Sequence, residues 1–163
     1  MADTRWLDAE EQQTWRSYVT ASRLVFDRIE RQLQNEAGLP HAYYEILVRL
    51  SEAPDRTLRM SQLASTSLSS RSRLSHAVAR LEESGWVRRR PCPSDRRGQL
   101  AELTDDGMRR LEAAAPGHVE EVRAVLFDRL TVGQQNALRE ISDVLAGDLS
   151  DRPLRPAAAD DPA

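Results

Sequence analysis

The sequence contains few of the residues that cross-link a chain or hold it in a membrane. Its 163 residues include a single cysteine, which excludes an intramolecular disulfide and fits a reducing compartment. No apolar run approaches the roughly 18 residues of a membrane-spanning helix, and the N-terminus lacks the basic, apolar and small-residue order of a signal peptide. We therefore expect a cytoplasmic protein with no membrane partner. The length predicts one domain, or one domain with an appended dimerisation layer.

The sequence also lacks the residue combinations on which catalysis and metal binding depend. No glycine-rich loop is present to cradle a phosphate, and no nucleophile, base and orienting residue form a recognisable set. The three histidines, His41, His76 and His118, stand with Cys92 at no metal-ligand spacing. We therefore expect no enzyme activity, no metal and no cofactor.

Lysine is absent, and all 23 basic residues are arginine. We attribute this to a genome-wide compositional bias, so the number of arginines by itself indicates little. Their distribution is more informative, because the net charge of −3 combines two regions of opposite sign. Residues 49–97 hold 11 arginines and 5 acids, a net charge of +6, while the rest of the chain holds 12 arginines and 21 acids, a net charge of −9. A basic segment within an acidic chain is typical of a surface that faces phosphates.

An amphipathic helix is predicted from Ser69 and Ser70, which suit an N-cap, to Gly85, which suits a stop. Its inward side carries apolar residues at helical spacing, namely Leu74, Ala77, Val78 and Leu81. The opposite side carries residues that reach base edges or phosphates, namely Ser69, Ser72, Arg73, His76 and Arg80. A short helix over residues 60–64 and a turn over residues 65–68 precede it. Two helices joined in this way form a helix-turn-helix, whose second helix enters the major groove of DNA.

After this helix the pattern changes from helical to extended. Residues 86–90 and 99–103 are predicted as two strands, and the Pro-, Asp- and Gly-containing residues 91–98 as a protruding turn between them. Such a hairpin beside a recognition helix is a wing. Arg96 and Arg97 at its tip suit the narrow, electronegative minor groove.

The spacing Asp95-x-Arg97, followed after five residues by Leu103-Thr104, resembles the wing signature of the MarR family of bacterial winged-helix transcription regulators. The order of the other elements is similar too, and the resemblance covers roughly residues 10–149. It implies a homodimer that binds a palindromic operator in double-stranded DNA, usually as a repressor, and often releases it when a small ligand or an oxidant arrives. By the same resemblance, Arg97 matches a wing arginine that contacts DNA, and Asp95 matches the acid that braces the wing.

Two helices are predicted before the helix-turn-helix. The first spans residues 10–36 and ends at Gly38. The second has Pro40 in its first turn, and its inward-facing positions are Tyr43, Ile46, Leu47 and Leu50. Four aromatic residues of these helices could line a pocket for a small aromatic ligand: Trp15, Tyr18, Tyr43 and Tyr44. Aromatic residues at helical spacing more often fill a core, and core packing is the interpretation that we favour.

Two helical segments are predicted after the hairpin. Thr104 is expected to cap one that Pro116-Gly117 kinks or interrupts, and Thr131 with Gln134 to form the capping box of the other. The end helices carry more apolar surface than a small winged helix covers, so we expect a homodimer with two recognition helices about 34 Å apart, one duplex turn.

The expected fold is therefore mainly α: a winged helix-turn-helix with a two-strand wing hairpin, and N- and C-terminal helices forming a dimerisation layer. The predicted parts are an N-terminal dimerisation helix (1–38), the DNA-binding domain (39–104), C-terminal dimerisation helices (105–149) and a disordered tail (150–163).

Two alternative functions stay open at this point. The winged helix could be a protein-interaction module whose arginine surface docks an acidic partner. Cys92, beside three arginines, could make the protein a redox-responsive regulator, although chance placement is the interpretation we favour. Those arginines, residues 88–90, alternate between the two sides of a strand, so at least one of them is expected to pack or pair within the protein.

Overall fold

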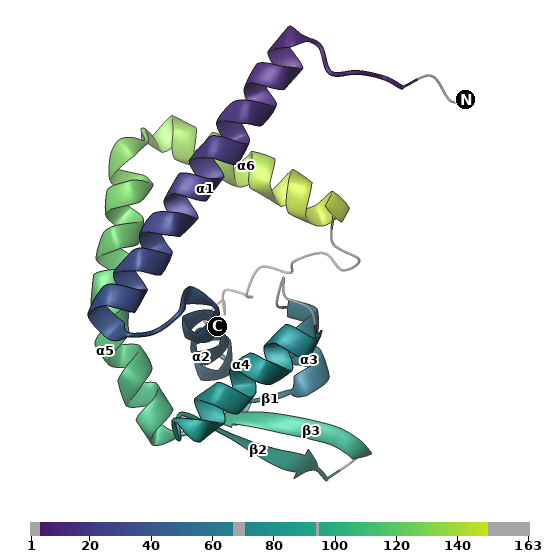
Figure 1. Ribbon diagram of the computed structural model, residues 1–163, viewed down its shortest axis with the longest axis vertical. Helices are drawn as coiled ribbons and strands as arrows, with labels where there is room; N and C mark the ends of the chain where they lie inside the picture. The colour runs from purple at the N-terminus through teal and green to yellow at the C-terminus, as the bar shows by residue number, and fades with distance from the viewer. Residues whose placement is uncertain (1–3, 67–70, 94, 150–163) are drawn as a thin grey trace, which may run out of the picture. The chain divides into compact units, whose positions relative to one another are not determined.

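The computed structural model describes residues 4–66, 71–93 and 95–149, and the side chains of residues 66, 71, 96, 97, 148 and 149 fall outside this description. Along the chain the elements are α1 (Ala9–Ala37), α2 (His41–Ser51), β1 (Thr57–Arg59), α3 (Met60–Thr66), α4 (Arg71–Glu83), β2 (Val87–Cys92), β3 (Asp95–Leu103), α5 (Asp105–Val125) and α6 (Val132–Leu149) (Figure 1). Short 3-10 helices lie at Pro54–Arg56 and Phe127–Arg129. The chain divides into two units, Met1–Val122 and Arg123–Ala163.

The long helix α1 begins and ends at strong local signals. Asp8 and Glu11 form a capping box, in which the Glu11 amide donates to Asp8 Oδ1 at 2.8 Å and the Asp8 amide donates to Glu11 Oε2 at 3.0 Å. At the other end Gly38 adopts φ 55°, and its amide donates to the Gln34 carbonyl at 3.0 Å. These caps place the helix within one residue of the predicted range of 10–36.

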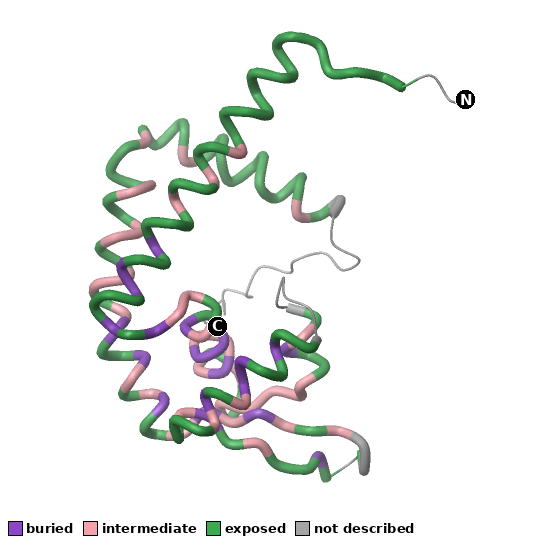
Figure 2. Tube along the Cα trace, viewed as in Figure 1, coloured by how far each residue is buried: buried purple, intermediate pink, exposed green. Residues whose placement is uncertain are grey.

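The core of the first unit lies where the C-terminal part of α1 meets α2, α4 and the sheet (Figure 2). The largest fully buried side chains are those of Leu33, Leu39, Leu47, Leu50, Leu63, Val78, Leu81 and Val87. Burial of these aliphatic side chains, each contributing about 1.5–3 kcal/mol relative to full exposure, supplies the main stabilisation of this unit.

Two expectations for α2 are wrong. Pro40 is the N-cap rather than a residue of the first turn, because its ψ of 140° is extended and α2 begins at His41. Tyr44, not Tyr43, is among the buried residues of this helix. Its ring packs on that of His118 with 4.4 Å between centroids, so the contact with α5 turns this side of α2 inward. Glu30 of α1 completes the N-terminus of α2 by accepting from the His41 amide at 3.0 Å.

The sheet has three antiparallel strands in the order β1-β3-β2. The hairpin of β2 and β3 confirms the predicted two-strand wing, and β1 is an additional strand of the sheet. The strand missing from the prediction, β1, pairs Leu58 with Ala101, and its three residues are too few to show alternation. The hairpin strands are also longer than expected, since β2 continues through Pro91 and β3 begins at Asp95. Proline is tolerated there because β2 is an edge strand.

The helix α5 begins at the predicted cap. The sequence predicts a kink or an interruption at Pro116-Gly117, and the interruption is wrong. The Gly107 amide donates to Thr104 Oγ1 at 3.0 Å, and the helix then runs continuously to Val125. Packing against α1 accounts for the continuity: a Cβ on Gly117 would lie 2.7 Å from Glu36 Oε2, and Arg28 pairs with Glu121 at 2.8 Å. Taken together, the elements along the chain confirm the predicted mainly α class and the winged helix-turn-helix.

The second unit consists of the end of α5, the following 3-10 helix and α6. Thr131 and Gln134 form the predicted capping box, with the Thr131 amide donating to Gln134 Oε1 at 2.9 Å and the Gln134 amide donating to Thr131 Oγ1 at 3.3 Å. None of the described residues of this unit is buried (Figure 2). No helix in the described parts of the chain has both the length and the apolar character needed to cross a bilayer. The predicted tail lies outside the described residues.

Candidate nucleic-acid interface

The helix α4 is buried along one side and open along the other. The predicted apolar stripe is confirmed, since Leu74, Ala77, Val78 and Leu81 are all buried against α2 and the sheet. The polar residues predicted for the opposite side and covered by the description, namely Ser72, Arg73, His76 and Arg80, are exposed. Ser69 lies outside the described residues. This helix therefore presents a polar, basic face of the kind that a major groove accepts.

At the C-terminal end of α4, Arg80 is already engaged by a neighbour. Its Nη1 lies 2.9 Å from Glu83 Oε2 on the same helix, and both side chains are largely exposed. An exposed pair of this kind contributes little to stability, so a phosphate can replace the carboxylate. Arg73 and His76 lie nearer the start of the helix, the end that contacts bases in helix-turn-helix proteins.

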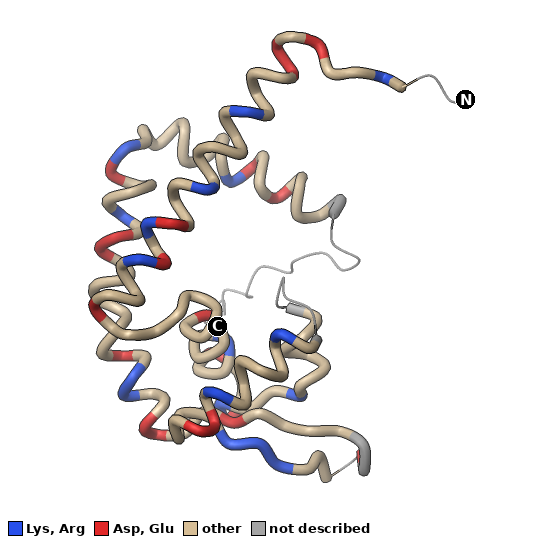
Figure 3. Tube along the Cα trace, viewed as in Figure 1, with Lys and Arg blue, Asp and Glu red and all other residues tan. Residues whose placement is uncertain are grey.

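The three consecutive arginines of β2 all pair within the protein, so the expectation that at least one would do so is confirmed. Arg88 and Arg90 flank Glu102 of β3, at 2.6 Å and 2.9 Å. Figure 3 shows the basic stretch of β2 in blue. Arg89 points the other way and meets Glu82 of α4. The dense basic run in the sequence thus stabilises the hairpin rather than facing solvent freely.

The tip of the hairpin is tightly built. Arg59 and Asp95 are 4.0 Å apart, which joins β1 to the beginning of β3. A Cβ on Gly98 would lie 2.9 Å from Asp95 Oδ2 and 3.0 Å from Cys92 Cβ, so glycine permits this close approach. Cys92 is buried. Arg96 and Arg97 belong to β3, but their side chains lie outside the described residues.

The four aromatic residues predicted as an effector pocket occupy different places. Trp15 and Tyr18 are exposed on α1 with ring centroids 6.2 Å apart. Tyr43 lines a cavity with Pro40, Arg80 and Trp86, whereas Tyr44 lines another of about 320 Å³ between α2 and α5. The pocket in this form stays a prediction.

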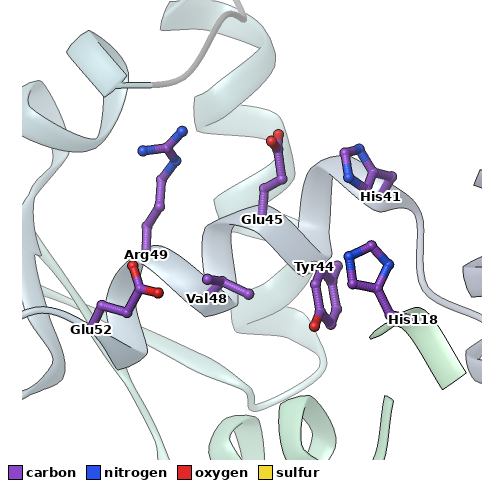
Figure 4. Close-up of a pocket in the computed structure, with 7 residues that line it drawn as sticks. All are labelled: His41, Tyr44, Glu45, Val48, Arg49, Glu52 and His118. Atoms are coloured by element: carbon purple, nitrogen blue, oxygen red, sulfur yellow. The ribbon is translucent and has the colours of Figure 1, made fainter. Parts of the chain in front are cut away.

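The cavity beside Tyr44 has an aromatic end and a charged end. Figure 4 shows His41, Tyr44 and His118 together at one end, and Arg49 and Glu52 at the other. Burial, with a smaller contribution from His41, lowers the pKa of His118 and favours its neutral imidazole. Burial also raises the pKa of Tyr44, which keeps its hydroxyl protonated. Among the described residues, none is within hydrogen-bonding reach of His118 Nδ1.

Sequence reasoning missed the acidic residues of this region. Glu82 and Glu102 lie at the ends of α4 and β3, and the arginines they bind are seven to fourteen residues away in sequence. From the sequence His118 is only a histidine without metal-ligand spacing, whereas the structure places it in the lining of the cavity beside Tyr44. Within the described ranges no group of three or more His, Cys, Asp or Glu side chains is placed to hold a metal ion.

Comparison with known proteins gives consistent matches. A family model described as MarR family matches residues 37–98. The chain is similar to Sco3205, a MarR family transcriptional regulator from Streptomyces coelicolor crystallised in complex with DNA, with 55% identity, a TM-score of 0.88, and 95% of this chain and 100% of that chain covered. It is also similar to the HTH-type transcriptional regulator PecS of Dickeya dadantii, with 31% identity over 105 residues, 63% of each chain.

A further relative is the HTH-type transcriptional repressor YetL of Bacillus subtilis, which is 34% identical over 89 residues, 55% of this chain and 53% of that protein. The chain thus matches less than two thirds of the length of PecS and YetL. The match to Sco3205, by contrast, extends over the whole of that chain.

Proposed function

Because this chain belongs to the MarR family of transcriptional regulators, we propose that it is a cytoplasmic, homodimeric repressor that binds an inverted repeat in duplex DNA. The observation that carries the proposal is the exposed polar face of α4 beside an arginine-rich hairpin. Two relatives support it: Sco3205 was crystallised with DNA, and YetL is named a repressor.

In this proposal α4 enters the major groove. Arg73 and His76 reach base edges, Ser69 and Ser72 position the helix, and Arg80 exchanges Glu83 for a phosphate. The hairpin lies along the DNA backbone and reaches the flanking minor groove. There Arg96 and Arg97 meet the negative electrostatic potential of the groove. Asp95 braces the tip through Arg59.

A homodimer is supported by apolar residues that the single chain leaves exposed. On α1 these include Trp15, Tyr18 and Phe26, exposed by 55–59%. On α6 the residues Leu138, Ile141, Val144 and Leu145 recur at helical spacing and are exposed by 40–63%. Because the described part of the second unit has no buried residue, a second copy of the chain is the partner that gives it a core.

Removing one arginine from each element tests the assignment. We expect Arg97→Ala to weaken binding to all duplex sequences and to reduce the slope of log K against log salt by roughly two per dimer, one per wing. Arg73→Ala is expected instead to relax sequence preference, at about 1–3 kcal/mol per half-site. Fluorescence anisotropy with specific and scrambled duplexes over a salt series measures both effects.

Arg139→Ala is a matched control, since it removes the same charge from an exposed position on α6. It should bind as wild type does. If Arg97→Ala and Arg73→Ala also bound like wild type, or if the wild type showed no salt-dependent duplex binding, the arginine surface would serve another partner, such as an acidic protein.

We further propose that the cavity beside Tyr44 is an effector site for a small aromatic molecule. Its volume of about 320 Å³ suits a compact ligand, and the Tyr44 and His118 rings offer stacking surfaces. Binding there would change the separation of the two recognition helices, with a coupling of about 1–3 kcal/mol, or 5- to 150-fold in operator affinity.

Filling this cavity should remove the response. Val48 lines it and is half-buried, so Val48→Phe is expected to leave operator binding intact while abolishing release by benzoate-type acids and phenols. Tyr43→Phe alters a residue of the other cavity and should respond as wild type does. Equal release of the wild type and Val48→Phe in anisotropy titrations would place the effector elsewhere.

A further inference from the structure

The carboxylate of Glu82 is fully occupied by a single residue of the wing. Its Oε1 accepts the backbone amide of Arg89 at 3.0 Å, and its Oε2 accepts Nε and Nη2 of the same residue at 2.8 Å and 2.5 Å. Both side chains are about one-third exposed. Hydrogen bonds from the Arg89 side chain, and then from its amide, lower the pKa of Glu82, so the carboxylate is ionised at neutral pH.

This contact closes an edge of the sheet. In the strand order β1-β3-β2, one side of β2 has no neighbouring strand, and the Arg89 amide points to that side. An open edge amide would otherwise be satisfied by water or by another chain. Glu82 satisfies it from the last turn of α4, and so fixes where along the helix the strand lies.

The two strands of the hairpin are joined by ion pairs on either side of Arg89. Glu102 of β3 lies directly opposite Arg88 in the strand register and binds both Arg88 and Arg90. The tip lies about three residues beyond Arg89, which is about 10 Å at 3.3 Å per residue. A tilt of β2 at Arg89 would therefore displace the hairpin beyond it by an amount that grows with the distance from Arg89.

We propose that Glu82 is a positioning residue, which holds the wing at one angle to the recognition helix α4 so that both elements reach the duplex in a single prearranged geometry. The inference rests on the proposed function. Its physical basis is that a wing already ordered before binding loses less conformational freedom when it contacts DNA. Glu82 itself contacts no DNA in this arrangement, because Arg89 occupies its carboxylate.

The direction in which DNA affinity changes when the Glu82 charge is removed distinguishes a positioning role from simple electrostatic repulsion. Removing an acid beside a DNA-binding surface should tighten binding, because repulsion from phosphates falls. The probe is a duplex that the wild type selects from a random library. We expect Glu82→Gln to bind this duplex about tenfold more weakly than the wild type does. The adjacent Glu83→Gln removes the same charge from the same helical turn and should bind at least as tightly as wild type. Tighter binding by Glu82→Gln would overturn the proposal.

A double-mutant cycle tests whether Glu82 acts through the wing. If it positions the wing, Glu82→Gln should change affinity less than twofold once Arg96→Ala and Arg97→Ala together have removed the wing contacts, whereas its tenfold effect should persist beside Arg73→Ala. An effect of equal size in both backgrounds would indicate a general loss of structure and contradict the proposal.

Hydrogen exchange without DNA keeps this test separate from that of the proposed function. In Glu82→Ala the Arg89 amide loses its acceptor, so its exchange should accelerate at least tenfold, while the amides of β3 stay protected as in the wild type. Unchanged exchange at Arg89 would refute the contact itself. A wild type that fails to bind duplex DNA but shows this protection would refute the proposed function and leave the Glu82 contact standing.

Discussion

Replacing Gly107 by alanine is expected to lower the free energy of unfolding by about 3 kcal/mol. Gly107 lies in the first turn of α5, where the helix passes directly over the base of the wing. A Cβ at this position would lie 2.1 Å from the carbonyl oxygen of Trp86 and 2.9 Å from its carbonyl carbon. These are backbone atoms, and the oxygen also accepts the Thr104 amide at 3.1 Å, so neither can move without breaking the hairpin base.

The expected loss comes from this clash, and it is opposite in sign to the ordinary effect of the same substitution in a helix. Glycine to alanine in an open helix stabilises by about 1 kcal/mol. Gly133→Ala, where a Cβ on α6 would meet nothing within 4 Å, is the matched control and should be neutral or slightly stabilising. Urea unfolding of both variants at one protein concentration measures the difference. A Gly107→Ala protein as stable as wild type would show that α5 and the wing base can separate freely.

Much of the fold follows from local signals in the sequence. The capping pairs of α6 and α5, at Thr131 and Thr104, are short-range patterns in which a side chain binds an amide three residues away. The apolar stripe of α4 is equally local, and the structure buries all four of its predicted residues. Helices long enough to show a clear period are therefore the part that a sequence specifies best.

The errors arise where distant contacts decide the local structure. β1 is held by pairing with β3, more than forty residues later, and three residues carry no period of their own. Pro116-Gly117 is predicted to kink or interrupt α5, but packing on α1 through Gly117 and Glu121 keeps the helix continuous. Propensity is a weak prior, and tertiary contacts override it in both cases.

Only the part of the candidate site that depends on local sequence could be predicted. The exposed face of α4 follows from its helical period, so Arg73, His76 and Arg80 could be named beforehand. The carboxylates that fix the hairpin could not be named beforehand. Pairing of Glu82 with Arg89, for example, depends on the turn between α4 and β2. A sequence shows which residues are basic, whereas the fold decides which of them are already engaged.

Introducing a charge on the apolar side of α6 is expected to reduce operator affinity by about 10²–10⁴-fold. Ile141 is 58% exposed in the single chain, so Ile141→Glu should be harmless to an isolated chain. In the proposed homodimer the same position is buried, and an unpaired carboxylate there opposes association. Each half-site would then be bound by an independent chain, without the effective concentration that a tethered second recognition helix provides.

The control is Asn136→Glu, because Asn136 is also exposed on α6 but lies on the polar side, away from Leu138, Ile141 and Val144. Light scattering should give twice the chain mass for the wild type and this control, and a single chain mass for Ile141→Glu. Should Ile141→Glu fail to fold alone, the unfolding midpoint of the wild type must rise with protein concentration, as it does for a dimer that is more stable than its parts. A concentration-independent midpoint together with monomeric mass for the wild type would contradict the dimer, and with it the inverted repeat, because one recognition helix reads only one half-site.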